Sequence, residues 1–164
     1  MPGLSKEELH ARFRDALGSN LTETSPLDAV PMLLRVATLA RPLAVYAFTV
    51  SNPPGGRSAL ESKIQLMTPT QRRGERAQLV APGGHFLVLA GVVPDKPVFV
   101  LWDAYLQSNF TWSKNVQVRT EAIWQAEIDG IATRERRLQT GRETVIAARA
   151  DQLVAALKMR ISGP

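Results

Sequence analysis

The sequence of 164 residues contains no cysteine, and it contains no run of 18 apolar residues. The first absence excludes disulfide bridges, thiolate zinc sites and cysteine nucleophiles. The second predicts that no helix spans a membrane. The charged N-terminal stretch also lacks the apolar centre of a secretory signal. We therefore expect a soluble, cytoplasmic protein without a membrane partner, folded as a single domain over residues 1–164.

Histidine is scarce, and several nucleotide-binding and catalytic motifs are missing. His10 and His85 are the only histidines, and neither has a second histidine at metal-ligand spacing. The glycine-rich stretch at residues 53–57 lacks the Gly-Lys-Ser/Thr ending of a phosphate-binding loop. The patterns G-x-G-x-x-G and G-x-S-x-G are absent as well. The sequence thus gives no sign of a histidine zinc site, a P-loop or a serine-hydrolase elbow.

The chain carries a net charge of +5 at neutral pH, and arginine dominates its basic segments. Between residues 57 and 76 the net charge is +3, from five basic and two acidic residues. A second basic group lies between residues 134 and 142, where one glutamate stands among four arginines. The planar guanidinium suits phosphate better than the point charge of lysine does. This distribution favours an anionic partner, most often nucleic acid, over a charge that serves solubility alone.

Helix signals stand near both ends of the chain. Ser5 and Glu8 form a capping box before an amphipathic stretch, which predicts a helix that ends at Gly18. A second start signal predicts another helix within residues 25–37, although Pro31 delays its first turn. Further helices are expected at residues 121–129 and 150–161.

Stretches rich in β-branched and aromatic residues predict the strands of a sheet. These expected strands are residues 41–51, 61–68, 85–93, 97–103, 112–119 and 143–148. Residues 94–96 join two of them as a tight hairpin. The expected fold is α+β: a mixed, mostly antiparallel sheet of five to six strands, flanked by N- and C-terminal helices. In this fold a helical segment, residues 1–40, packs on an α/β core formed by residues 41–161.

Glu61 and Lys63 form an E-x-K pair on one expected strand. Positions i and i+2 of a strand face the same side, so these side chains share one face, and Ile64 and Leu66 lie on the other. A carboxylate can hold Mg²⁺ and a nearby cation can assist at the phosphate, as metal-dependent nucleases require. The preceding strand offers no second acid, and Asp28 is the nearest upstream carboxylate. An ordinary pair on a solvated face is the simpler interpretation.

An aromatic and polar block between residues 102 and 124 contains all three tryptophans. Aromatic rings beside amide and carboxylate groups can stack on a base and read its edge. The candidate base pocket consists of Trp102, Asp103, Trp112 and Asn115. A core seam against the helix at residues 121–129 explains Trp102 and Trp112 equally well, and it is the favoured interpretation for Trp124.

Two stretches of the chain resemble known proteins. They are PPGGRSALESKIQL at residues 53–66, followed by QRRGER, and VFVLWDAYLQSNFTWSKNVQVR at residues 98–119, followed by an expected helix. Together they resemble small bacterial proteins and domains that accompany DNA methylases and restriction genes, over residues 41–150. The E-x-K strand alone resembles the half-motif of PD-(D/E)xK nucleases, from which it departs by lacking a strand-borne Asp. These resemblances imply a DNA substrate, a role in host defence, and Glu61 and Lys63 as catalytic residues.

The leading hypothesis is a DNA-binding protein of a restriction-modification or defence system, with Mg²⁺-dependent restriction-type cleavage as its enzymatic form. In that form the catalytic candidates are Glu61, Lys63 and Asp28, and Glu61 is the metal ligand. The residues expected to contact DNA are Arg57, Arg72, Arg73, Arg76, Lys114 and Arg119. A non-catalytic reader of DNA or of a modified base needs no cofactor, and a structural or protein-interaction module is a third alternative. The sequence leaves open both catalysis and a homodimer.

Overall fold

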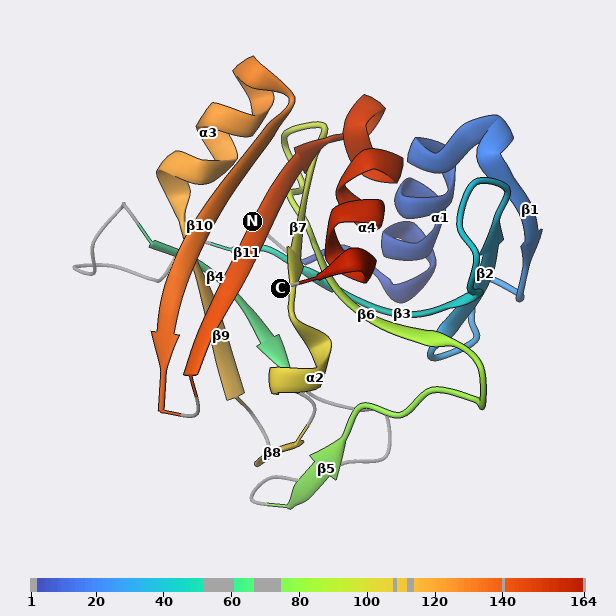
Figure 1. The fold of residues 1–164 in the computed structure, drawn as a ribbon, viewed down its shortest axis with the longest axis horizontal. Helices are drawn as coiled ribbons and strands as arrows, with labels where there is room; N and C mark the ends of the chain where they lie inside the picture. Colours follow the sequence, from blue (N-terminus) through green and yellow to red (C-terminus); the bar gives the residue numbers. More distant parts are fainter. Residues whose placement is uncertain are drawn as a thin grey trace.

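The computed structural model describes residues 3–51, 61–66, 75–107, 109–111, 114–139 and 141–163. A central sheet of seven strands has the order β1-β2-β3-β6-β7-β11-β10 (Figure 1). Its neighbouring strands are antiparallel, except β3 and β6, which are parallel. The α+β class and the mostly antiparallel sheet are confirmed, with more strands than the five to six expected. The strands of this sheet are β1 (Leu21–Thr24), β2 (Met32–Val36), β3 (Leu43–Thr49), β6 (Phe86–Val92), β7 (Val98–Trp102), β10 (Ile131–Leu138) and β11 (Gly141–Arg149).

Helices α1 (Lys6–Leu17) and α4 (Leu153–Ser162) cover one face of this sheet (Figure 1). The predicted capping box begins α1, because Ser5 Oγ accepts from the N–H of Glu8 while the Glu8 carboxylate accepts from the N–H of Ser5. Phe13 of α1 packs edge-on against Phe99 of β7, with the ring centroids 5.7 Å apart. The short 3₁₀ turns η1 (Gly18–Asn20) and η2 (Ala150–Gln152) adjoin these helices. The two ends of the chain therefore share one apolar layer.

A two-stranded antiparallel ribbon and helix α3 (Thr120–Asp129) cover the opposite face of the sheet. The ribbon consists of β4 (Glu61–Leu66) and β9 (Lys114–Arg119). Ile64 and Leu66 are fully buried against the sheet, whereas Lys63 and Gln65 lie on the outer side. This confirms the alternation predicted for the strand. The same layer continues with α2 (Ala104–Gln107), β5 (Arg76–Gln78) and β8 (Asn109–Thr111).

The helix predicted within residues 25–37 is wrong. Strand β2 occupies Met32–Val36 and pairs with both β1 and β3. Met32, Leu34 and Val36 are all buried, which is the period of two that a strand requires. Pro31 has no N–H to donate within a helix, so the apolar spacing of this segment was a misleading signal. The N-terminal 40 residues thus contribute one α-helix and two strands, and these strands join the same sheet as the rest of the chain.

Strand β10 has no counterpart among the predicted elements. Its sequence, IATRERRL, has charged residues at four of eight positions, a pattern without an apolar face. The structure explains this pattern, because β10 is the last strand of the sheet and one of its edges has no partner strand. Charged side chains on such an edge protect it from pairing with another chain. Within the described residues, no helix has the length and apolar character needed to cross a membrane.

Candidate nucleic-acid interface

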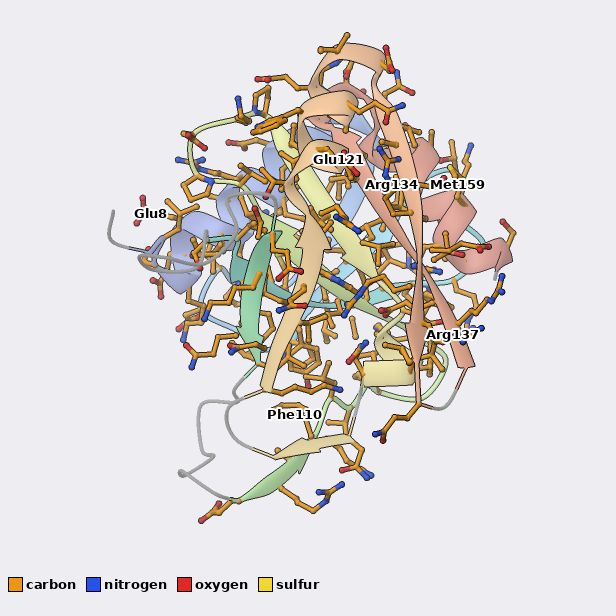
Figure 2. The ribbon with its side chains drawn as sticks, turned by 90° about the vertical axis from the view of Figure 1, so that its left-hand side faces the viewer. Glu8, Phe110, Glu121, Arg134, Arg137 and Met159 are labelled. Atoms are coloured by element: carbon orange, nitrogen blue, oxygen red, sulfur yellow. The ribbon has the colours of Figure 1, made fainter. Side chains whose placement is uncertain are left out.

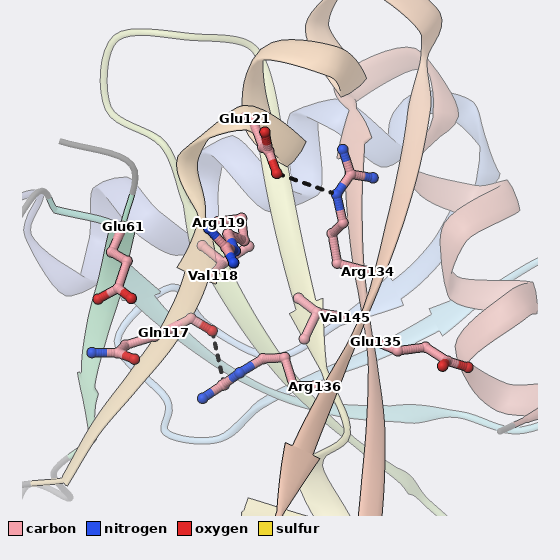
Figure 3. Close-up of a pocket in the computed structure, with 9 residues that line it drawn as sticks. All are labelled: Glu61, Gln117, Val118, Arg119, Glu121, Arg134, Glu135, Arg136 and Val145. Carbon is pink, nitrogen blue, oxygen red and sulfur yellow. Dashed lines mark hydrogen bonds and ion pairs between the residues drawn. The ribbon is translucent and has the colours of Figure 1, made fainter. Parts of the chain in front are cut away.

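A cleft of about 340 Å³ lies between the β4–β9 ribbon and the β10–β11 hairpin (Figure 3). The ribbon contributes one wall, the hairpin contributes the other, and the first turn of α3 closes one end. Three arginines and two glutamates face this space, so the cleft is strongly polar and presents both signs of charge, whereas the side chain of a third lining glutamate, Glu135, points away from it (Figure 3). Its lining residues are Glu61, Gln117, Val118, Arg119, Glu121, Arg134, Glu135, Arg136 and Val145.

The hairpin that forms one wall projects beyond the body of the sheet (Figure 1). Strand β11 pairs with β10 from residue 141 to residue 148, but it pairs with β7 only from Ile146 to Arg149. The distal half of the hairpin, residues 134–138 and 141–145, is therefore a two-stranded ribbon. It carries four arginines, of which Arg137 and Arg142 are exposed. Figure 2 shows Arg134 beside Glu121 and Arg137 closer to the free end of the hairpin.

Arg134 and Arg136 reach from β10 toward the opposite wall of the cleft. Arg134 lies 3.9 Å from a carboxylate oxygen of Glu121 and donates a hydrogen bond of 2.6 Å to Gln125 Oε1. Arg136 Nη1 donates a hydrogen bond of 2.8 Å to the carbonyl oxygen of Gln117 on β9 (Figure 3). These contacts hold both guanidinium groups at defined places in the cleft, about a quarter to a third exposed.

The carbonyl of Gln117 is available to Arg136 because of the pairing register of the ribbon. Gln117 stands opposite Lys63, whose backbone N–H and C=O bond to Ser51 on the other side of β4. Lys63 and Gln117 are therefore a non-hydrogen-bonded pair. In an antiparallel sheet, the two residues of such a pair direct their backbone N–H and C=O groups away from each other. The Gln117 carbonyl therefore points to the outer edge of β9, where the indole N–H of Trp102 also donates to it at 2.9 Å. The side chains of Trp102 and Arg136 thus both donate to the Gln117 carbonyl oxygen, which does not bond to β4.

Glu61 and Lys63 share the outer face of β4, as the sequence predicts. Glu61 lines the cleft, and Lys63 Nζ donates to Asn115 Oδ1 at 3.4 Å. Asp28 lies in the turn between β1 and β2, at the edge of the central sheet opposite to β10, so the structure does not bring it to Glu61. Within the described part of the chain, no group of three or more His, Cys, Asp or Glu could hold a metal ion. Magnesium binding by Glu61 and catalysis by Glu61 and Lys63 stay predictions.

The candidate base pocket is not assembled as expected. Trp102 is fully buried in the core, so a base cannot stack on its ring in this conformation. Asp103 Oδ1 accepts from the backbone N–H groups of Tyr105 and Leu106 and thereby caps α2. Asn115 lies on the outer face of the ribbon, and Trp112 lies outside the described residues. The tryptophan expected in a core seam, Trp124, is instead 48% exposed on α3.

The predicted DNA-contacting residues fall into two groups. Arg57, Arg72 and Arg73 lie outside the described residues. Arg76 is exposed on β5, Lys114 begins β9, and Arg119 ends β9 at the cleft. Arg134 and Arg136 complete the cleft, although the sequence showed them only as part of a basic group. Along the sequence, Arg134 and Arg136 alternate with Thr133, Glu135 and Arg137. This period of two is the signal that both arginines face the same side of a strand.

A buried carboxylate supports the hairpin from below the cleft. The side chain of Glu143 on β11 has no exposed surface. Its carboxylate accepts from the N–H of Asp103 and from Gln107 Nε2, and it lies 3.6 Å from Arg136 Nη1. Burial raises the pKa of Glu143, while the hydrogen bonds from Gln107 and Asp103 and the charge of Arg136 act in the opposite direction. On the neighbouring helix, burial lowers the pKa of Arg160, which donates to the carbonyl of Thr144.

The sequence signature of one protein family covers most of this architecture. The Methylase-associated X1 family matches residues 41–157, which contain both walls of the cleft and the whole of α3. The chain belongs to the Methylase-associated X1 family. The resemblance to methylase-associated domains is thereby confirmed, and the family description links the chain to methylases and suggests a role in restriction-modification. No curated protein and no solved structure matches the chain significantly.

Proposed function

We propose that this protein is the DNA-contacting component of a methylase-containing restriction-modification system, and that it binds duplex DNA along the cleft. The observation that carries the proposal is the convergence of Arg119, Arg134 and Arg136 on one cleft from two separate ribbons. Membership in a methylase-associated family supports DNA as the anionic partner, because a methylase of such a system acts on DNA. The net charge of +5 supports the same choice.

The shape of the hairpin supports this mode of binding. The major groove of B-DNA accepts an α-helix or a two-stranded β-ribbon. Residues 134–138 and 141–145 form such a ribbon and project beyond β7. The guanidinium groups of the arginines along this ribbon can donate hydrogen bonds to phosphate oxygens. An arginine can also donate two hydrogen bonds to O6 and N7 of guanine. The hairpin can therefore contact the groove while Arg119 on the opposite wall contacts the backbone.

The acidic residues of the cleft favour the reader over the nuclease. Glu61 and Glu121 share the cleft with the arginines, and a carboxylate beside a phosphate is repulsive. A carboxylate is, however, a suitable acceptor for the amino group of cytosine. Since the described residues contain no group of three or more potential metal ligands, base-edge contact is the role that we infer for these carboxylates. We therefore place the non-catalytic reader ahead of the endonuclease.

Fluorescence anisotropy with a labelled duplex tests the proposal. We expect a dissociation constant of about 1 µM or tighter at about 50 mM salt, which weakens steeply as salt rises. Arg119→Ala and Arg134→Ala should each weaken binding roughly tenfold at low salt and reduce the salt slope by about 1. Arg35→Ala is the matched control, because Arg35 is an exposed arginine on β2, outside the cleft. Absence of binding by the wild-type protein at about 50 mM salt would refute the proposal.

A further inference from the structure

Among the described strands, the distal half of the β10–β11 hairpin has no partner from the body of the sheet, so side chains must hold it in place. Besides Arg134, which bonds to Gln125 of α3, three of its contacts reach other elements. Arg136 bonds to the Gln117 carbonyl on β9, and Arg160 of α4 bonds to the Thr144 carbonyl. The third contact is made by Glu143, whose carboxylate is directed toward α2. The position of the hairpin, and hence the width of the cleft, depends on these contacts.

Glu143 connects the body of the protein to an arginine of the cleft. On one side its carboxylate accepts from the Asp103 N–H at 3.0 Å and from Gln107 Nε2 at 3.1 and 3.2 Å. On the other side it lies 3.6 Å from Arg136 Nη1, and Arg136 is its direct cross-strand neighbour. Among the described residues, Gln107 Oε1 is buried without a hydrogen-bond partner, and the Gln107 amide is oriented toward the carboxylate through Nε2. A buried carboxylate with these donors has a single well-defined position.

The contacts of Arg136 leave most of its donors available. A guanidinium carries five N–H donors, and both contacts of Arg136 within the described residues use Nη1. The N–H groups of Nε and Nη2 therefore remain for a ligand in the cleft. Because Glu143 and the Gln117 carbonyl fix Nη1 from two sides, the direction of the remaining donors is set before a ligand arrives. Such preorganisation lowers the entropic cost of ordering the Arg136 side chain when a ligand binds.

We propose that Glu143 is a positioning residue for DNA binding, which acts by orienting Arg136 and anchoring the hairpin to α2. This inference rests on the proposed function. It makes an unusual prediction, because Glu143 is negatively charged and lies under a DNA-binding surface. Long-range electrostatics predicts that removal of this charge strengthens DNA binding. A positioning role predicts the opposite sign.

Two isosteric variants separate these effects. Glu143→Gln removes the buried charge, and Glu135→Gln removes an exposed charge from the same hairpin, where Glu135 pairs with Arg142 at 3.3 Å. We expect Glu135→Gln to bind duplex DNA at least as tightly as the wild type does. We expect Glu143→Gln to bind about fivefold more weakly, which corresponds to the net value of about one hydrogen bond. Thermal unfolding of each variant checks that the fold is retained.

A double-mutant cycle identifies the path of the effect. If Glu143 acts through Arg136, then Glu143→Gln should have no further effect on DNA affinity in an Arg136→Met background. If Arg136→Met alone fails to fold because it leaves the buried charge of Glu143 unpaired, Arg136→Lys serves as the background instead: it keeps a positive charge but lacks the guanidinium fork, so Glu143→Gln should have a smaller effect on DNA affinity there than in the wild type. Binding by Glu143→Gln that equals or exceeds that of the wild type, or an undiminished effect without Arg136, would overturn the inference. Wild-type protein that binds no DNA would instead overturn the proposed function.

Discussion

At the scale of single residues, Gly91 on β6 is a position where packing leaves no room for a side chain. A Cβ atom there would lie 2.5 Å from Val50 Cγ2 and 2.9 Å from Trp102 Cζ3. The indole of Trp102 is fully buried and bonds to the Gln117 carbonyl beneath the cleft, so it cannot move aside freely. We expect Gly91→Ala to lower the free energy of unfolding by about 1–3 kcal/mol, the usual cost of overpacking. Urea denaturation measures this loss.

Gly83→Ala is the matched control for that substitution. Gly83 has no heavy atom within 4 Å of a built Cβ, and its φ is not in the left-handed region. Alanine also restricts the unfolded chain, so this variant should unfold at an equal or slightly higher urea concentration. If both variants lose stability equally, then packing against Trp102 is not the cause.

Lys63 allows the enzymatic alternative to be tested separately from DNA binding. If Glu61 and Lys63 are catalytic, Lys63→Ala should abolish Mg²⁺-dependent nicking of a supercoiled plasmid while leaving DNA affinity nearly unchanged. The reason is that a group acting on the transition state changes rate rather than binding. Gln65→Ala, on the same strand and the same outer face, serves as the control. Wild-type protein that binds DNA but nicks nothing in Mg²⁺ or Mn²⁺ would eliminate the catalytic role.

At the scale of elements, the segments that carry local signals were predictable from the sequence. The capping box predicted the start of α1, and apolar runs around Pro94 and Lys96 predicted the antiparallel β6–β7 pair. Gly130, whose φ of 97° suits glycine, closes α3 at the end of its predicted range. Elements without such signals were missed, because β2 is a short strand after Pro31 and β10 is a charged edge. Their assignment depends on the neighbouring strands.

The candidate site depended still more on tertiary structure. The shared face of Glu61 and Lys63 follows from the period of a strand, so the sequence predicted it correctly. That Arg134 and Arg136 face Arg119 follows from the packing of two ribbons that are distant in sequence, which no local pattern encodes. Asp28 is the nearest carboxylate upstream of Glu61 in the sequence, but it lies in the turn between β1 and β2 at the far edge of the sheet. The buried role of Glu143 was likewise invisible, because its donors come from α2 and β10.

At the scale of the whole molecule, the two faces of the central sheet have different compositions. The face under α1 and α4 is a continuous apolar layer that includes Phe13, Met32 and Leu153. The other face buries its apolar residues beneath the β4–β9 ribbon and α3, and the outer surfaces of these elements carry the polar cleft. The β4–β9 ribbon and the β10–β11 hairpin thus bury apolar side chains in the core on this face of the sheet. This division places the proposed interface on projecting elements rather than on the core.

The stability of the whole molecule should depend on pH through His10, which anchors α1 to the β1–β2 turn. His10 is buried, and its Nδ1 lies 2.7 Å from the Leu27 carbonyl oxygen, so the neutral imidazole donates there. Burial lowers the pKa of His10, with Lys6 and Arg14 acting in the same direction and Glu7 and the Leu27 carbonyl opposing it. The unfolded chain therefore binds a proton more readily than the folded protein does. Stability from His10 is present above the unfolded pKa of about 6.5 and is lost as pH falls toward the folded pKa.

Glu143 contributes to the pH dependence of stability with the opposite sign. Because burial raises its pKa, the folded protein takes up a proton before the unfolded chain does, and acidification below the folded pKa relieves a penalty. We therefore expect urea denaturation to show the free energy of unfolding falling from about pH 7.5 to about pH 5.5, the window around the histidine pKa. His10→Gln keeps a donor for the Leu27 carbonyl and cannot titrate, so its unfolding free energy should change less over this window. An identical pH slope in His10→Gln and the wild type would show that this histidine does not control acid stability.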